Sequence, residues 1–247
     1  MVTTDTLGYY RAHGALTEPG RHAARFDALP RDLPVLCQFI QGVILHADWA
    51  AAYGVKDTGL SRETLPVEGR LTLADSLLPQ RKTPGTCRDF ALMLCSILRQ
   101  HAVPARVRCG FASYFKTNPF EDHWVCGYWK PAEQRWALAD AQLDALQRNH
   151  LGVQFDTTDL PQGAFLNGGQ AWTRWRAGKV DATTFGHGDA VGPWFLRVNL
   201  MRDQLALQKR EMSDWDSWRA TAAADKVLSD QVLAEGDRIA ATTSEAS

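Results

Sequence analysis

Three side chains in this sequence combine the residue types and the order of a nucleophilic acyl-transfer site. Cys87 stands at the start of a predicted helix, His123 at the start of a predicted strand, and Asp140 at the end of the next strand. A thiol that attacks an acyl carbon needs a base to take its proton and a third group to hold that base in the right tautomer. We therefore predict Cys87 as the nucleophile, His123 as the base and Asp140 as the orienting acid.

The sequence around Cys87 explains why this thiol is expected to react. A Pro-Gly pair breaks the chain just before it, and Thr86 with Asp89 is predicted to form a capping box at the start of a helix over residues 87–101. Unpaired backbone N–H groups and the helix dipole favour an anion in that first turn, which is the environment that activates a thiol. The alternative for any cysteine taken alone is a small buried core residue.

Structural alternatives exist for the other two members of the set. His123 taken alone could be a core histidine beside tryptophans, and Asp140 could cap the turn that follows its strand. Asp144, just beyond that strand, is the competing candidate for the orienting role. Asp89 and Asp122 are interpreted as cap or ion-pair partners. The ordered combination of nucleophile, base and orienting acid favours a triad over these separate roles.

The elements that must position these residues follow from hydrophobic periodicity and from turn signals. Helices are predicted over residues 32–53, 71–78, 87–101, 170–177, 193–211 and 224–241. Strands are predicted over residues 106–111, 123–129 and 135–140, with mostly irregular structure over residues 1–31 and 152–169. Short consecutive strands with tight connections favour an antiparallel sheet, whose last hairpin returns Asp140 towards His123. The expected fold class is α+β, in a single domain over residues 1–247.

Composition argues against several classes of function. The 247 residues include 27 basic and 28 acidic ones, a net charge of −1, so no basic field is present for a nucleic acid or an anionic membrane surface. No glycine-rich nucleotide-binding motif occurs, so no cofactor is expected. The sequence shows no signal-peptide pattern and no apolar run that could span a bilayer, which predicts a cytoplasmic protein without a membrane partner. Composition leaves the oligomeric state open.

The five cysteines are odd in number and show no CxxC spacing. They are expected to be reduced thiols, in keeping with a cytoplasmic location. Their spacing fits no zinc pattern, so no metal site is predicted. They are Cys37, Cys87, Cys95, Cys109 and Cys126.

Four short blocks around the predicted site resemble one known family. In chain order they are Gly85-Thr86-Cys87-Arg88-Asp89-Phe90-Ala91, Val103-Pro104-Ala105-Arg106-Val107, Asp122-His123-Trp124-Val125 and Arg135-Trp136-Ala137-Leu138-Ala139-Asp140. Together they resemble the core of the transglutaminase-like superfamily of papain-related thiol enzymes, over about residues 80–145. The resemblance implies a Cys87–His123–Asp140 triad, with the catalytic helix packed on an antiparallel sheet. It also implies a bacterial-type single-domain protein, with a core over about residues 71–145 and helical flanks over residues 1–70 and 146–247.

The resemblance also concerns the oxyanion hole. The backbone N–H of Cys87, at a helix start, is the first expected donor. Related enzymes take the second donor from a residue before the cysteine, often Trp or Gln, and Trp49 and Gln80 are the candidates here. Trp49 is the preferred one, and core packing is the structural alternative for either residue.

Two functions are compatible with this sequence. The first is cysteine-dependent acyl transfer at an amide or thioester carbonyl of a small molecule or peptide, through a covalent acyl-enzyme on Cys87, with water or an amine as the acceptor. No motif in the flanks names the substrate, and the absence of extra β-sandwich domains means that protein cross-linking is not implied. The second is a catalytically silent transglutaminase-like binding or scaffold module. The intact set of three residues favours the first, because packing alone requires none of them.

Overall fold

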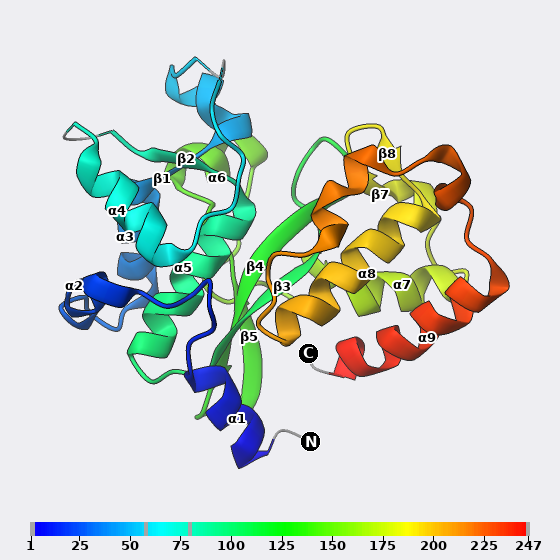
Figure 1. Cartoon of the computed structure of the whole chain (residues 1–247), viewed down its shortest axis with the longest axis horizontal. Helices are drawn as coiled ribbons and strands as arrows, with labels where there is room; N and C mark the ends of the chain where they lie inside the picture. The colour runs from blue at the N-terminus through cyan, green and yellow to red at the C-terminus, as the bar shows by residue number, and fades with distance from the viewer. Residues whose placement is uncertain (1–2, 57–58, 79–80, 246–247) are drawn as a thin grey trace. The chain divides into compact units, whose positions relative to one another are not determined.

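The computed structural model describes residues 3–56, 59–78 and 81–245 of the chain (Figure 1). The chain divides into two compact units, each built from discontinuous stretches. Unit 1 consists of Met1–Val107, Val125–Arg148 and Asp156–Asp159, and unit 2 consists of Arg108–Trp124, Asn149–Phe155 and Leu160–Ser247. Both units mix helices with strands, which confirms the α+β class. The single domain over residues 1–247 stays a prediction.

The central element of unit 1 is helix α5 (Cys87–Gln100), whose ends agree with the predicted helix to within one residue. Every residue from Arg88 to Arg99 is buried, because neighbouring helices enclose α5. These neighbours are α1 (Thr4–Arg11), α2 (Ala23–Asp27), α3 (Leu33–Val43) and α4 (Val67–Ser76). Cys87 therefore stands at the first position of a helix whose body is fixed in the core.

A short parallel ribbon leads into α5. Strand β1 (Ile44–His46) pairs with strand β2 (Thr83–Gly85), with His46 opposite Gly85. Because β2 ends two residues before Cys87, this pairing fixes the direction from which the chain enters the helix.

The prediction of one continuous helix over residues 32–53 is wrong, because strand β1 interrupts it. Helix α3 ends at Val43, β1 follows, and the 3₁₀ helix η2 (Ala47–Tyr53) completes the stretch. The apolar residues do continue at helical spacing, but the strand partner of β1 lies far away in the sequence. Tertiary pairing overrides a local propensity in this case.

Strands β4 (Phe120–Lys130) and β5 (Arg135–Ala139) form the predicted antiparallel hairpin, with Cys126 opposite Ala139. Strand β3 (Ala105–Ala112) is also present where a strand is predicted. By residue number, β3 and β4 each run from one unit into the other. The three predicted strands are thus confirmed, and β4 begins three residues earlier than expected.

Unit 2 adds three short strands that the sequence analysis did not predict. Strand β6 (Phe165–Asn167) pairs antiparallel with β3, and β7 (Phe185–His187) pairs parallel with β4 and antiparallel with β8 (Ala190–Val191). The strand order of the larger sheet is β6-β3-β4-β7-β8, with β5 paired to β4. The β4–β7 pair is parallel, so the sheet is mixed and not wholly antiparallel.

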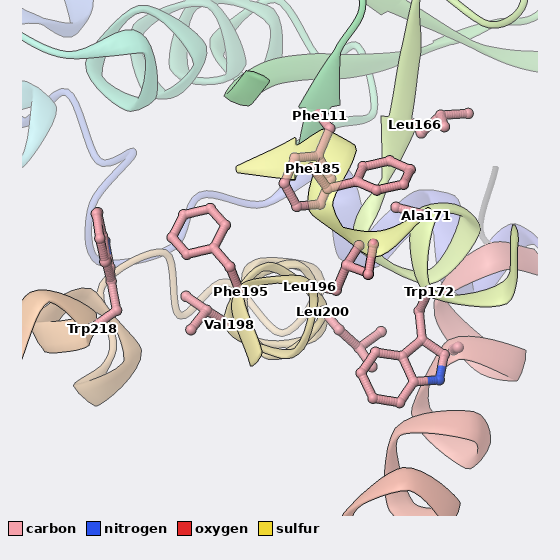
Figure 2. Close-up of a cluster of buried hydrophobic side chains, with 12 residues drawn as sticks. Phe111, Leu166, Ala171, Trp172, Phe185, Phe195, Leu196, Val198, Leu200 and Trp218 are labelled. Atoms are coloured by element: carbon pink, nitrogen blue, oxygen red, sulfur yellow. The ribbon is translucent and has the colours of Figure 1, made fainter. Parts of the chain in front are cut away.

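Unit 2 is held together by a cluster of buried apolar side chains, shown in Figure 2. Its long helices, which pack against one another, are α7 (Gly168–Arg176), α8 (Pro193–Leu207) and α9 (Asp230–Glu245). Phe195 of α8 lies with Phe111 of β3 and Phe185 of β7, and the rings of Phe111 and Phe185 have centroids 5.0 Å apart. Full burial of such side chains contributes about 1.5–3 kcal/mol each.

The remaining elements are short. They are α6 (Ala145–Leu151), η1 (Gly20–His22), η3 (Ala182–Thr184), η4 (Asp214–Ala220) and η5 (Ala223–Lys226). The stretch 1–31 is therefore partly helical, contrary to the prediction, and the predicted helix over residues 71–78 begins at Val67. Of the helices described, none combines the length and apolar character needed to cross a membrane.

Candidate functional site

Cys87 is the first residue of α5 and is partly buried. The backbone N–H of Thr86, the N-cap residue, donates to Asp89 Oδ2 at 2.8 Å, and the Thr86 hydroxyl lies 3.2 Å from the same oxygen. These contacts confirm the predicted partnership of Thr86 with Asp89. They also fix the first turn of the helix, where backbone N–H groups are available to an anion.

The other four cysteines are buried, and none of the five forms a disulfide. Burial, with a smaller contribution from Asp140, raises the pKa of Cys37 to about 12. Burial and the neighbouring Cys95 thiol raise the pKa of Cys126. A buried protonated thiol is a poor nucleophile, so Cys87 is the cysteine most available for chemistry. Within the described residues, no group of three or more His, Cys, Asp or Glu side chains could hold a metal ion.

A buried ion pair lies next to Cys87 in unit 1. Arg70 of α4 donates through Nη2 to Asp89 Oδ1 at 2.6 Å, and both side chains are almost completely buried. Arg70 Nη1 donates to the carbonyl oxygen of Pro84 at 2.8 Å and to Thr83 Oγ1 at 3.1 Å. This pairing confirms the interpretation of Asp89 as a cap and ion-pair residue.

Asp140 follows directly after β5 and is buried. Its backbone N–H donates to the carbonyl of Thr157 at 2.8 Å, and its Oδ1 accepts from the backbone N–H of Gln142 at 3.0 Å. Ala139, the residue before it, pairs with Cys126 at the last register position of the β4–β5 hairpin. The chain leaves the sheet at this point, and Asp140 is held by backbone contacts at the strand end.

His123 lies in β4 and is buried in unit 2. Its ring meets the ring of Phe115 edge-on at a centroid distance of 4.8 Å, and that of Tyr114 at 5.9 Å. Aromatic side chains on two sides restrict how far the imidazole can turn.

The neighbours of His123 in β4 are tied to helix α8. Arg202 Nη1 donates to Asp122 Oδ2 at 3.1 Å, and the Arg202 guanidinium lies 5.1 Å from the ring centroid of Trp124. Asn199 Nδ2 donates to Asp122 Oδ1 at 2.9 Å, and Arg202 Nε donates to Asp216 at 3.2 Å. The interpretation of Asp122 as an ion-pair partner is thus confirmed.

Asp144, the competing candidate for the orienting role, has partners of other kinds. Its Oδ2 accepts from the Tyr53 hydroxyl at 2.6 Å, and its Oδ1 accepts from the backbone N–H of Gln147 at 3.0 Å. Burial and the hydrogen bond to Asp144 raise the pKa of Tyr53, so this phenol keeps its proton and donates. Both oxygens of Asp144 therefore accept hydrogen bonds within unit 1 from groups that are not histidines.

A small cavity lies beside this network in unit 1, with about 180 Å³ of space when its open mouth is included. Gln142 Nε2 donates to Gln147 Oε1 at 3.0 Å, and Gln147 Nε2 donates to the Tyr53 oxygen at 3.2 Å. This arrangement leaves Gln142 Oε1 as a buried acceptor with no donor among the described residues. The lining residues are Gln41, Ile44, Leu45, His46, Tyr53, Lys82, Phe90, Gln142, Asp144 and Gln147. A cavity of this size and polarity suits a water molecule better than a drug-sized ligand.

The two candidates for the second oxyanion donor differ in what the structure describes. Trp49 is partly buried in η2, and it lies in the sequence between His46 and Tyr53, which line the cavity. Gln80 lies outside the described residues. The oxyanion role of Trp49 stays a prediction.

Cys87 begins α5 as predicted, whereas His123 lies three residues inside β4 and Asp140 directly follows β5. Cys87 and Asp140 belong to unit 1, and His123 belongs to unit 2, so the triad as a set stays a prediction. Sequence reasoning missed Arg70 and the polar residues Tyr53 and Gln142 around the cavity. No local signal identifies them, because their roles depend on which other segments of the chain they contact.

Comparison with known proteins gives one family match. The transglutaminase-like superfamily core matches residues 46–141. No curated protein matches the sequence. A solved structure described as a putative cysteine protease from Cytophaga hutchinsonii shares 16% identity, over 67% of this chain and 46% of that chain, with a TM-score of 0.43. The periplasmic domain of TgpA from Pseudomonas aeruginosa, bound to ethylmercury, shares 18% identity, over 57% of this chain and 49% of that chain, with a TM-score of 0.36. The match spans about half the length of either structure.

Proposed function

We propose, from the match of residues 46–141 to the transglutaminase-like superfamily core, that the protein is a cysteine-dependent enzyme that transfers an acyl group from an amide or thioester. The observation that carries the proposal is the position of Cys87. It is the first residue of α5 and partly exposed, whereas the other four cysteines are buried. Unpaired backbone N–H groups in the first turn of a helix can stabilise the oxyanion that forms when a carbonyl is attacked.

The proposed reaction has two halves. In the first, His123 takes the thiol proton, Cys87 Sγ forms a bond to the carbonyl carbon, and the tetrahedral intermediate collapses as His123 returns the proton to the leaving amine or thiol. The product is an acyl group joined to Cys87 as a thioester. In the second half, water or an amine attacks this thioester, His123 takes the proton of the attacking group, and the Cys87 thiol is restored.

The strand register supports Asp140 as the group that orients His123. Asp140 directly follows Ala139, whose partner in β4 is Cys126, three residues along that strand from His123. Both oxygens of Asp144 already accept hydrogen bonds from Tyr53 and Gln147. We therefore keep Asp140 in the orienting role.

The oxyanion of the tetrahedral intermediate needs donors that are in place before it forms. The backbone N–H of Cys87, in the first turn of α5, is the first donor in this proposal. Trp49 supplies the second through its indole N–H, from η2 after strand β1.

The substrate class is a small molecule or peptide with an amide or thioester carbonyl. The near-neutral composition, with 27 basic and 28 acidic residues, fits an uncharged substrate better than a nucleic acid. The five reduced cysteines favour the cytoplasm as the compartment of the enzyme.

The test is intact mass spectrometry of the protein after exposure to a panel of primary amides, peptides and thioesters. The wild type is expected to gain the mass of one acyl group, and Cys87→Ala is expected to gain none. His123→Ala should slow acylation by about 10²–10⁴-fold, because it removes the general base.

A matched pair of variants tests the third role. Asp140→Asn should slow acylation strongly, whereas Asp144→Asn should leave acylation close to the wild-type rate. The catalytically silent scaffold becomes the better account if no substrate acylates the wild type and Cys87 reacts with iodoacetamide no faster than a cysteine in an unfolded peptide.

A further inference from the structure

Arg70 lies outside the proposed triad, yet it contacts the chain on both sides of Cys87. We propose that Arg70 is a positioning residue that holds the Cys87 thiol in the orientation needed for attack, an inference that rests on the proposed function of Cys87. Arg70 belongs to α4 and its side chain is 1% exposed, so its hydrogen bonds form away from competing water.

Before Cys87, Arg70 holds strand β2. Its Nη1 donates to the carbonyl oxygen of Pro84 at 2.8 Å and to Thr83 Oγ1 at 3.1 Å. The Thr83 hydroxyl in turn donates to the carbonyl of Val43 at 3.1 Å, at the end of α3. Because hydrogen bonds from a charged donor are strong, the Pro84 peptide cannot turn without a substantial loss.

After Cys87, Arg70 holds the first turn of α5. Its Nη2 donates to Asp89 Oδ1 at 2.6 Å. The same carboxylate accepts the backbone N–H of Thr86 at 2.8 Å and that of Leu65 at 3.3 Å. One guanidinium therefore fixes the peptide groups that enter and begin the turn containing Cys87.

The space around Gly85 shows how closely this turn packs against the ion pair. A Cβ atom at Gly85 would lie 3.0 Å from Asp89 Oδ2, 3.1 Å from Ile44 Cγ2 and 3.2 Å from Arg70 Nη1. These distances are shorter than ordinary van der Waals contact. The chain next to Cys87 thus has little freedom to shift while Arg70 and Asp89 stay paired.

The geometry requires an arginine and not only a positive charge. A planar guanidinium presents donors in fixed directions and serves β2 and Asp89 at once, whereas the single ammonium of a lysine cannot span both. Arg70→Lys keeps the charge near Asp89 but releases one side of the turn. Since a misplacement of about 1 Å can cost about 10²-fold in rate, the reactivity of Cys87 should depend on the complete set of contacts.

The test is the rate at which iodoacetamide alkylates Cys87 in Arg70→Lys, followed by intact mass spectrometry across the pH range in which circular dichroism shows a folded protein. We expect the rate to fall by about tenfold or more, and its pH profile to change, because the thiol no longer faces a fixed set of neighbours. With an acyl substrate in hand, kcat should fall more than KM changes. A folded Arg70→Lys protein with the wild-type rate and pH profile would overturn the proposal.

The control is Arg108→Lys in unit 2, which alters an equally buried arginine–aspartate pair with Asp203. This variant should lose stability and yet alkylate Cys87 at the wild-type rate while folded. Equal slowing in Arg70→Lys and Arg108→Lys would show a general loss of stability and would also overturn the proposal.

A second variant keeps the test usable if Arg70→Lys does not fold. Gly85→Ala retains every charged group and crowds the turn by one methyl group, so we expect a smaller decrease in the same rate. An unchanged rate in Gly85→Ala would contradict the proposal. A different result would count against the proposed function itself. In that case, iodoacetamide would alkylate Cys87 of the wild-type protein no faster than it alkylates a cysteine in an unfolded peptide.

Discussion

Two buried arginine–aspartate pairs, one in each unit, use their donors differently. The side chains of Arg70–Asp89 and of Arg108–Asp203 are equally buried, at 1% exposed for each arginine and 0% for each aspartate. Arg108 directs Nε and Nη2 to the two oxygens of Asp203, each at 2.9 Å, and Nη2 also reaches the carbonyl of Thr243 at 3.1 Å. Arg70 directs only Nη2 to Asp89 and uses Nη1 for the chain before Cys87.

The two arginine–aspartate pairs therefore have different structural roles. Arg108 joins whole elements, since Asp203 belongs to α8, Thr243 to α9 and Arg108 itself to β3. Arg70 shapes a turn a few residues long beside the proposed nucleophile. A broken buried ion pair is costly wherever it lies, but only the pair beside Cys87 should change reactivity beyond its effect on stability.

The largest effect is expected where the pair joins elements. Arg108→Met leaves Asp203 as a buried, unpaired charge and should lower the free energy of unfolding by about 3–5 kcal/mol in urea denaturation. The double variant Arg108→Met, Asp203→Leu removes both charges and should recover part of this loss. The single variant Asp203→Leu completes the comparison. If the losses of unfolding free energy in Arg108→Met and Asp203→Leu simply add up in the double variant, the two charges do not interact as described.

A helix glycine in unit 2 gives the next largest effect. Gly→Ala inside a helix usually stabilises by about 1 kcal/mol, but a Cβ at Gly236 would lie 2.2 Å from Cζ2 of Trp172. Trp172 is fully buried and its Nε1 donates to Asp237 at 2.8 Å, so the ring cannot move away. Gly236→Ala should therefore lower the free energy of unfolding by about 1–3 kcal/mol in urea denaturation.

The control for this prediction lies in unit 1. A Cβ at Gly8 in α1 would meet nothing within 4 Å, so Gly8→Ala should stabilise by up to about 1 kcal/mol. Opposite signs for the two substitutions support the packing described around Trp172. The same sign for both contradicts it.

A smaller effect in unit 1 sharpens the contrast between the two pairs. Thr83→Val removes the hydroxyl that accepts from Arg70 and donates to the carbonyl of Val43, at almost constant side-chain volume. The free energy of unfolding should fall by about 1–2 kcal/mol, and alkylation of Cys87 should slow by a few-fold. Thr83→Ser keeps the hydroxyl and should restore the alkylation rate. A loss of stability without any change in that rate would remove Thr83 from the set of positioning contacts.

The smallest effect is a pH dependence in unit 2. His187 Nδ1 lies 2.7 Å from Glu121 Oε1. This hydrogen bond raises the pKa of His187, and burial opposes the shift. The native state therefore holds the proton to a higher pH than the unfolded chain, whose histidine pKa is about 6.5. The stabilisation is complete below that value and is lost as pH rises through the native pKa.

Urea denaturation of the wild type and His187→Gln over this pH range measures the effect. Since 38% of the His187 side chain is exposed, the change in unfolding free energy should stay below about 1 kcal/mol. The variant should show a flatter pH dependence than the wild type. An unfolding free energy that rises through this window in the wild type, and not in the variant, would contradict the assigned direction.

The sequence predicts the fold best where local signals agree. Helix α5 combines a turn, a cap and a long apolar stripe, and its predicted ends are confirmed. The hairpin of β4 and β5 is likewise confirmed, because β4 is rich in aromatic residues and a short turn joins the two strands. Strands of two or three residues, such as β6 and β8, escape prediction because so short a segment carries no period.

The candidate site also contains some residues that the sequence predicts and others that it does not. The residue types and order of Cys87, His123 and Asp140 are sufficient to nominate a triad, because each lies in or directly beside a locally predictable element. Arg70 could not be nominated, because a lone arginine in a predicted helix looks like an exposed charge. Its importance comes from three partners outside α4, and a sequence does not show which segments meet.

The burial of four cysteines has a use beyond the chemistry of Cys87. A buried thiol exchanges with a labelling reagent only when the surrounding structure opens, so its labelling rate reports an opening free energy. Cys37, Cys95 and Cys126 lie in unit 1, and Cys109 lies in unit 2. The labelling rates of these native cysteines therefore measure local opening in each unit, without any engineered probe.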